Sequence, residues 1–169
     1  MKAKIAIVGS GNIGWALKQL LKSDYDLRQG DIADGFDAKD INQAKDFLKG
    51  ADAVISAAPF AANKNIATVA AEEGIGYFDL TEDVETTDFI KTLESKSILM
   101  PQCGLAPGAI NICAASMMEE FDSVNEVLMR VGALPRFTTN EMSYYLSWST
   151  NGLINEYCNE ADAIYEGKA

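Results

Sequence analysis

The sequence predicts an α/β fold, a Rossmann-type doubly wound parallel sheet shortened between its second and fourth strands, followed by part of an α+β domain. Two patterns indicate this fold. Apolar runs alternate with segments of helical period over the first hundred residues, and a G-x-G-x-x-G motif directly follows the first run. The alternation stops after Pro107. The 169-residue chain is therefore expected to contain a first domain over residues 1–108 and a second over 109–169.

Strands and helices are predicted to alternate through the first domain. Short runs rich in apolar residues predict strands at Lys4–Val8, Ala53–Ala57, Gly76–Asp79 and Ser97–Met100, and Asp26–Asp31 is a weaker candidate strand. Apolar residues at helical spacing predict helices at Ile13–Leu21, Asp37–Lys49, Ala62–Glu73 and Val84–Ser95. Asp37 is the expected N-cap of its helix, and Gly50 and Gly74 are the expected stops.

The segment between the second and third predicted strands is short. Only about twenty residues separate Asp31 from Ala53, and one helix fills most of them. A doubly wound domain normally carries a further helix and strand there. We therefore expect this βα unit to be deleted or collapsed into Ile32–Asp37.

The second domain is expected to be of α+β type. Helices are predicted at Ala109–Glu120 and Leu153–Asn159, and strands at Val124–Gly132, Met142–Ser149 and Ala161–Glu166. The last strand has no hairpin partner before Ala169, so the domain is expected to be incomplete and the chain a fragment of a longer reading frame. Apolar side chains on these strands predict a homodimer formed through about residues 124–166; they are Leu128, Tyr145, Leu146, Trp148 and Tyr165. The alternative is a monomer whose helix at Ala109–Glu120 covers one face of the sheet.

Composition limits the possible partners and chemistry. The net charge is −11, from 25 acidic and 14 basic residues, so nucleic acid and membrane are poor partners. The absence of histidine excludes a Ser-His-Asp triad, a Cys-His pair and His-ligated zinc from this chain. The three cysteines show no metal-ligand spacing and no signal peptide is evident, so we expect no metal and a cytoplasmic location.

The glycine motif predicts a dinucleotide site. In Gly9-Ser10-Gly11-Asn12-Ile13-Gly14 the first glycine permits the tight turn, the second lets the backbone approach a pyrophosphate, and the third lets helix and strand pack closely. The helix N-terminus favours an anion. This context favours NAD(P) binding over the alternative, a purely structural glycine turn.

Asp31 bears on the choice of cofactor. It lies twenty residues after Gly11, where a carboxylate accepts hydrogen bonds from the adenosine ribose and repels a 2′-phosphate. This position favours NAD, with NADP possible. Two alternatives remain: Asp31 is merely a solvated acid at a strand end, or the register is shifted and Arg28 serves a 2′-phosphate.

Three strand ends should converge on the ligand, because ligands of open α/β sheets bind outside the carboxyl ends of the strands. Ala57, Ala58 and Pro59 leave room beside a cofactor, and Asp79, Thr81, Glu82 and Asp83 add polar groups. The turn Gln102–Gly108 should run near the nicotinamide. The alternative for Thr81, Glu82 and Asp83 is that they only cap the next helix. Cys103 lacks a basic partner in sequence, which disfavours a cysteine nucleophile as in semialdehyde dehydrogenases.

Three motifs resemble the saccharopine dehydrogenase and lysine 6-dehydrogenase family: Tyr77–Asp83 (YFDLTED), Met100–Gly108 (MPQCGLAPG) and Leu146–Tyr157 (LSWSTNGLINEY). The resemblance covers nearly the whole chain and implies an oxidoreductase that acts on a carbon–nitrogen bond of an amino acid with NAD or NADP. It implies cofactor contacts at Gly9–Gly14, at Ala57–Pro59 and at Gly104, Leu105, Pro107 and Gly108. It also implies substrate contacts at Leu80, Thr81 and Glu82 and from the second domain.

Two hypotheses of function follow. The first is an NAD(P)-dependent amino-acid dehydrogenase, lysine 6-dehydrogenase-like or saccharopine dehydrogenase-like, in which Asp79 and Glu82 are the candidate proton acceptors because no histidine is present. An acidic pocket also suits a substrate that carries an ammonium group. The second is a truncated cofactor-binding fragment without catalytic activity.

Overall fold

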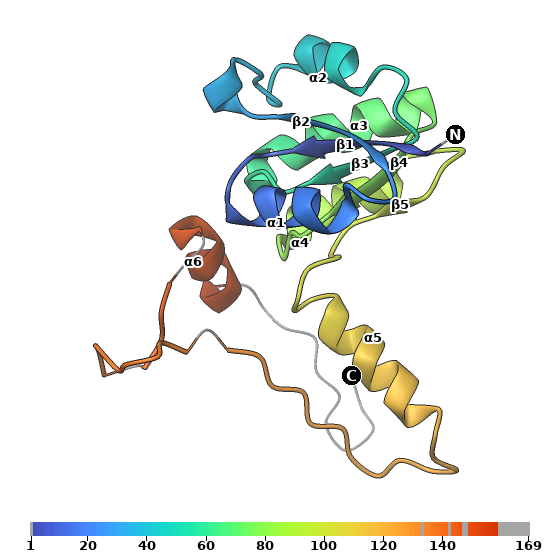
Figure 1. The fold of residues 1–169 in the computed structure, drawn as a ribbon. Helices are drawn as coiled ribbons and strands as arrows, with labels where there is room; N and C mark the ends of the chain where they lie inside the picture. The colour runs from blue at the N-terminus through green and yellow to red at the C-terminus, as the bar shows by residue number, and fades with distance from the viewer. Residues whose placement is uncertain (1, 133, 142, 147–148, 159–169) are drawn as a thin grey trace.

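The computed structural model describes residues 2–132, 134–141, 143–146 and 149–158 of the chain. Its centre is a parallel sheet of five strands in the order β2-β1-β3-β4-β5 (Figure 1). The strands are β1 (Lys4–Val8), β2 (Asp26–Gly30), β3 (Ala53–Ser56), β4 (Gly76–Asp79) and β5 (Leu99–Met100). All five predicted strands of the first domain are therefore present, and the α/β fold is confirmed.

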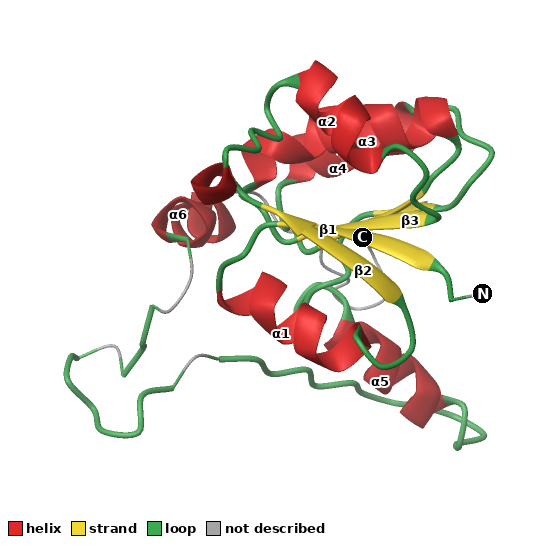
Figure 2. Cartoon of the chain, turned by 45° about the horizontal axis from the view of Figure 1, so that its top comes forward, coloured by secondary structure: helices red, strands yellow, loops and turns green. Residues whose placement is uncertain are grey.

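Six α-helices accompany the sheet in the described part of the chain. They are α1 (Asn12–Leu21), α2 (Ile41–Leu48), α3 (Asn63–Glu73), α4 (Val84–Thr92), α5 (Ala109–Met118) and α6 (Thr150–Cys158). Helix α1 covers one face of the sheet, and α2, α3 and α4 cover the other (Figure 2). The main core lies between the sheet and this second layer, with Val54, Tyr77 and Ile66 fully buried.

The strand order confirms the predicted shortening. In the standard doubly wound order a further strand flanks β2, whereas here β2 is the edge of the described sheet. The 3₁₀ segment η1 (Ile32–Asp34) and α2 fill its place. Phe36 and Phe47 stack with ring centroids 4.3 Å apart, and they lie so close over Gly30 that a Cβ there would be 2.7 Å from the Phe47 ring. The two stacked rings, which can lie this close because Gly30 has no side chain, thus occupy space beside β2 where the further strand would lie.

The start of α2 differs from the prediction. Asp37 was expected as its N-cap, but the helix begins at Ile41 and its N-cap is Asp40, whose Oδ1 accepts the Asn42 and Gln43 N–H groups at 2.9 and 3.4 Å. Asp37 instead accepts the Lys39 N–H at 2.9 Å in the preceding turn. Each aspartate accepts a hydrogen bond from the amide two residues ahead, so the two positions are locally alike, and the first of them was predicted.

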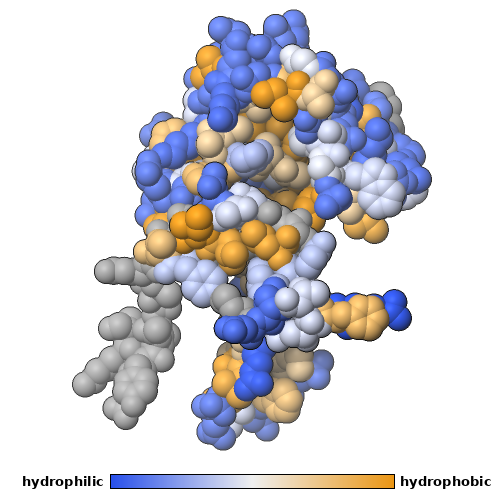
Figure 3. All heavy atoms as spheres, turned by 90° about the vertical axis from the view of Figure 1, so that its left-hand side faces the viewer, coloured by the Kyte–Doolittle hydropathy of each residue, from blue (hydrophilic) through white to orange (hydrophobic). Residues whose placement is uncertain are grey.

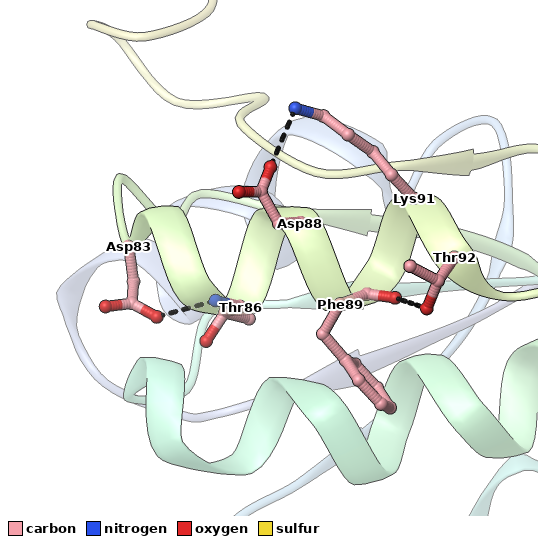
Figure 4. A network of polar contacts seen from close by, with 6 residues as sticks. All are labelled: Asp83, Thr86, Asp88, Phe89, Lys91 and Thr92. Atoms are coloured by element: carbon pink, nitrogen blue, oxygen red, sulfur yellow. Dashed lines mark hydrogen bonds and ion pairs between the residues drawn. The ribbon is translucent and has the colours of Figure 1, made fainter.

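The other helix ends follow ordinary capping chemistry. Gly74 adopts the left-handed conformation at φ 68° and terminates α3, as predicted. Asp83 Oδ2 accepts the Thr86 N–H at 2.8 Å and starts α4 (Figure 4). Helix α4 ends at Thr92, before the predicted Ser95. In Figure 4 Phe89 points toward the neighbouring helix, which anchors α4 to α3.

The second domain departs most from the prediction. Helix α5 is confirmed, and α6 begins at Thr150, three residues before the predicted Leu153. The predicted strand Val124–Gly132 is wrong for this structure, and so is Met142–Ser149 where it is described, because neither has a ladder partner among the described residues. Ala161–Glu166 lies outside the described residues. Helix α5 and the segment after it stand away from the sheet (Figure 1).

No helix within the described ranges is long and apolar enough to cross a membrane.

Candidate functional site

A cavity of about 320 Å³ lies at the carboxyl ends of β1, β3 and β4. It sits at the switch point between β1 and β3, where the chain changes the direction in which it adds strands and where ligands of doubly wound sheets bind. Figure 3 views the molecule from the side on which α6 lies and shows apolar surface bordered by hydrophilic groups. The cavity is lined by Gly11, Asn12, Ile13, Ala57, Ala58, Pro59, Phe60, Leu80, Thr81, Glu82, Ser149 and Gly152.

The three glycines of the loop between β1 and α1 have different surroundings. Gly9 has φ +102°, and a Cβ there would be 2.8 Å from the Ala57 carbonyl oxygen. A Cβ on Gly14 would be 2.0 Å from the Gly9 carbonyl oxygen. Gly11 has no neighbouring atom within 4 Å of its Cβ position, although it lines the cavity. The fold therefore explains Gly9 and Gly14, whereas the missing side chain of Gly11 leaves open space for a ligand.

Helix α1 begins at this open position. Gly11 is its N-cap and supplies no side-chain hydrogen bond. The first amides of an α-helix lack partners within the helix, and the dipole adds positive potential there. This donor set fits the pyrophosphate of a dinucleotide.

Asp31 lies beside the same loop, at the end of β2. Its Oδ2 accepts the Ser10 N–H at 2.6 Å, and its Oδ1 accepts the Ala33 N–H at 3.0 Å. These two bonds, that from Ala33 first, hold the pKa of the carboxyl below its ordinary value. Each oxygen keeps a further lone pair for a ribose hydroxyl. The structure thus joins Asp31 to the glycine loop, as the ribose prediction requires.

Arg28 is directed elsewhere. Its guanidinium lies 5.3 Å from the centroid of the Phe47 ring on α2, and burial lowers its pKa. The β1–β2 register pairs Arg28 with Ala6, two residues before the strands end. The shifted register that would bring Arg28 to a 2′-phosphate is not seen.

A buried polar network lies beneath the cavity and ties the strand ends together. Asp79 Oδ2 accepts hydrogen bonds from Tyr77 Oη at 2.6 Å and from Asn63 Nδ2 at 3.2 Å. Its Oδ1 accepts the N–H groups of Thr81 at 3.0 Å and Gln102 at 3.1 Å. Ser56 Oγ extends the network by donating to Asn63 Oδ1 at 2.7 Å. The network therefore joins the ends of β3 and β4 to the segment after β5.

The Asp79 side chain is fully buried within this network. Burial raises its pKa, while the hydrogen bonds, that from Tyr77 first, oppose the rise. Burial and the neighbouring Asp79 carboxylate likewise raise the pKa of Tyr77. All four groups bonded to the carboxyl are donors, an arrangement that suits an acceptor-only carboxylate. Asp79 does not line the cavity. It binds the groups around it by hydrogen bonds, which is what a positioning residue does.

Glu82 and Asp83 have separate positions. Glu82 lines the cavity, and among the described residues it is the one ionisable side chain in that lining. Asp83 caps α4, as the capping alternative proposed. Of the two predicted proton acceptors, the structure therefore brings Glu82 to the cavity and keeps Asp79 below it.

The turn after β5 lies next to the cavity but does not line it. A Cβ on Gly108 would be 2.2 Å from the Gly104 carbonyl oxygen, so the turn folds back tightly on itself. A Cβ on Gly104 would be 3.4 Å from the Leu80 carbonyl oxygen, which places the turn behind the lining residue Leu80. The predicted cofactor contacts at Gly104, Leu105, Pro107 and Gly108 stay predictions.

Cys103 shows no sign of activation. Its thiol lies 3.3 Å from the Met100 carbonyl oxygen, and burial raises its pKa. A nucleophilic cysteine requires the opposite shift. Within the described residues, no group of three or more Cys, Asp or Glu side chains is arranged to hold a metal ion.

Three lining residues were not predicted. Phe60 follows Pro59 directly, and Ser149 and Gly152 come from the start of α6. Ser149 Oγ accepts the Gly152 N–H at 3.2 Å, an N-cap bond. A serine immediately before the helical run Thr150–Cys158 was the available signal. It was missed because Met142–Ser149 was interpreted as a strand.

Comparisons with known proteins agree with this architecture. Residues 104–169 match the saccharopine dehydrogenase C-terminal domain. The structure is similar to apo saccharopine dehydrogenase (L-Glu forming) from Saccharomyces cerevisiae, at TM-score 0.64 and 17% identity, over 90% of this chain and 40% of the yeast chain. A Rex-family repressor, RSP, matches at TM-score 0.46 and 19% identity, over 70% of this chain and 61% of its own. The part of the chain from residue 104 onward thus matches a domain of the family that the motifs indicated, the yeast structure shares the fold, and the chain spans 40% of the length of the yeast enzyme.

Proposed function

We propose that this chain, which matches the saccharopine dehydrogenase C-terminal domain over residues 104–169, is an NAD(P)-dependent oxidoreductase of that family that acts on a carbon–nitrogen bond of an amino acid. One observation carries the proposal. The open position of Gly11 and the uncapped start of α1 face a cavity at the β1/β3 switch point. A loop that has no side chain at Gly11, next to the free amides at the start of α1, suits a pyrophosphate.

The chain offers a separate group for each part of the cofactor. The loop Gly9–Ile13 would hold the pyrophosphate, Asp31 the adenosine ribose, and Ala57–Pro59 the nicotinamide side. When bound, the nicotinamide supplies the hydride acceptor. The carboxylate of Asp31 favours NAD over NADP, and the Arg28 guanidinium lies over the Phe47 ring.

Glu82 is the proposed proton acceptor for the amine. It is the only ionisable side chain that lines the cavity in the described structure. A carboxylate in a mostly apolar cavity attracts an ammonium group and can remove a proton from it. Asp79 is proposed instead to hold the Thr81 and Gln102 backbones in place.

Turnover tests the proposal. The chain is incubated with NAD or NADP and with lysine or saccharopine, and NADH or NADPH absorbance is followed. We expect reduction with one of these amino acids and a large loss of kcat in Glu82→Gln, with cofactor binding retained. Reduction that is equally fast in Glu82→Gln would exclude Glu82 as the acceptor.

A second candidate function is cofactor binding without catalysis. The cavity lining in the described residues has no basic side chain that could bind a substrate carboxylate. This candidate predicts NAD binding by calorimetry with no turnover of either amino acid, and any turnover by this chain rejects it.

A further inference from the structure

We propose that Gln29 is a positioning residue for the dinucleotide, and that it acts through the backbone of the loop between β1 and α1. Its side chain does not line the cavity and lies outside the glycine motif. The inference rests on the proposed function, because the site is the same. It adds the group that holds the loop in its binding conformation before the cofactor arrives.

The end of β2 bonds the start of this loop at three consecutive positions. The Gly9 N–H donates to the Gly30 carbonyl oxygen at 2.8 Å. Gln29 Nε2 donates to the Gly9 carbonyl oxygen at 2.9 Å. The Ser10 N–H donates to Asp31 Oδ2 at 2.6 Å. Two side chains and one carbonyl of the same strand end therefore hold two adjacent loop residues.

The two side chains act on one peptide unit. The Gly9 carbonyl and the Ser10 N–H belong to the same planar trans peptide, in which they point in opposite directions. Gln29 donates to the oxygen of this peptide, and Asp31 accepts its N–H. A flipped peptide would turn the carbonyl oxygen toward the Asp31 carboxylate and leave the Gln29 amide without its acceptor. Both side chains therefore favour the same orientation.

The backbone at Gly9 needs this support. Its φ is +102°, and glycine adopts positive and negative φ about equally, so the residue has little preference of its own. The Gly9 carbonyl oxygen is also close to α1, because a Cβ on Gly14 would be 2.0 Å from it and 3.1 Å from Gln29 Nε2. A carbonyl oxygen enclosed between a strand and a helix is costly without a donor. Gln29 supplies that donor.

The orientation of this peptide matters to the ligand through Asp31. The carboxylate is held between the Ser10 N–H and the Ala33 N–H, which leaves one lone pair on each oxygen for a ribose hydroxyl. The same backbone leads directly to the open position at Gly11. A loop that is not held must lose its freedom when the cofactor binds, and that entropy cost lowers the affinity. Gln29 thus raises NAD affinity without contacting NAD.

Strand β2 offers a matched control. Alternate side chains of a strand share a face, so Leu27 lies on the same face as Gln29, the face that α1 covers. Gln29→Met keeps the length of the side chain and removes its donor. Leu27→Met makes a similar apolar change two residues away, beyond the bonds that hold the loop. A second test variant, Gln29→Glu, keeps the size but accepts instead of donating at neutral pH.

Amide hydrogen exchange of the chain without cofactor, followed by NMR, tests the bonds at the loop. We expect the Ser10 N–H to exchange roughly tenfold faster in Gln29→Met and in Gln29→Glu, because the unpaired Gly9 carbonyl favours release of the peptide. The amides of β1 should exchange as in the original chain. A residue that only stabilised the whole fold would change both sets together. Leu27→Met should leave the Ser10 rate unchanged.

Calorimetric titration with NAD tests the positioning role. We expect the dissociation constant to rise roughly fivefold or more in Gln29→Met and to stay unchanged in Leu27→Met. Circular dichroism checks that each variant is folded, and Gln29→Glu replaces Gln29→Met if the latter does not fold.

The outcomes that contradict the proposal differ from those that contradict the proposed function. An unchanged Ser10 exchange rate in both Gln29 variants, or an equal rise in Leu27→Met, overturns the bonds as the cause. Faster Ser10 exchange with unchanged NAD affinity overturns the positioning role. If the original chain binds neither NAD nor NADP, the proposed function itself fails, and that result is seen before any variant is made.

Discussion

Gly14→Ala should destabilise the fold through one steric contact. The new Cβ would be 2.0 Å from the Gly9 carbonyl oxygen, so one of the two must move by more than an ångström. Gly9 is held by its N–H bond to the Gly30 carbonyl at 2.8 Å and by the Gln29 Nε2 bond to its own carbonyl at 2.9 Å. Overpacking costs about 1–3 kcal/mol and each strained hydrogen bond about 1 kcal/mol. We expect a loss of roughly 4 kcal/mol in the free energy of unfolding.

Urea unfolding followed by circular dichroism measures this loss, and Gly11→Ala is the matched control. Nothing lies within 4 Å of the Gly11 Cβ position, and its φ of −63° suits alanine. The weaker N-cap and the stiffer unfolded chain nearly cancel, so the control should stay within about 1 kcal/mol of the original chain. In thermal melts the difference between the variants should be roughly 10 °C. Equal stability of Gly14→Ala and Gly11→Ala would refute the steric account of the loop.

Three further predictions concern the carboxylates. Asp31→Ala should weaken NAD binding by about 1–3 kcal/mol and NADP binding less, measured by calorimetry, because the ribose hydroxyls lose their acceptor; equal losses would show that Asp31 is not the ribose carboxylate. Asp79→Ala should lower the free energy of unfolding by about 3 kcal/mol in urea titrations, because two side-chain donors and two amides lose their acceptor. Burial raises the pKa of Asp79 in the folded chain, so the stability linked to its proton is full below the unfolded pKa of about 3.9 and is lost as pH rises through the folded pKa. The stability advantage of the original chain over Asp79→Asn should therefore shrink as pH rises through that window, and a constant difference would contradict it.

The first domain was predictable because its signals are local. Buried strands such as Lys4–Val8 form continuous apolar runs, and Gly74 stops α3 by backbone conformation alone. The short stretch between Asp31 and Ala53 even indicated the missing strand by its length. The stacking of Phe36 on Phe47 over Gly30 could not be predicted from the sequence, because it depends on three segments meeting in space.

The second domain was harder to predict because strands depend on partners. The alternation in Val124–Gly132 matches a strand, yet a strand exists only when another segment supplies its hydrogen bonds. The described residues supply none, so the structure assigns no strand to this segment. The pattern gave the local conformation but not its partner.

The sequence predicted where the candidate site lies, but it predicted the roles of the site residues only in part. The rule that ligands bind at the strand ends brought Ala57–Pro59 and Leu80–Glu82 to one cavity. The same rule could not separate Asp79 from Glu82, although one is buried in a network and the other lines the cavity. The alternation along β4 turns Asp79 toward the core with Tyr77, a distinction that depends on which face of the strand is covered.

The most direct test is calorimetric titration of the chain and of Gly11→Ala with NAD. The open Gly11 position predicts one NAD site per chain, with affinity reduced roughly tenfold or more in Gly11→Ala while the unfolding transition stays unchanged. Absence of NAD and NADP binding by the original chain, or equal affinity of both proteins, would contradict the assignment of this cavity to a dinucleotide.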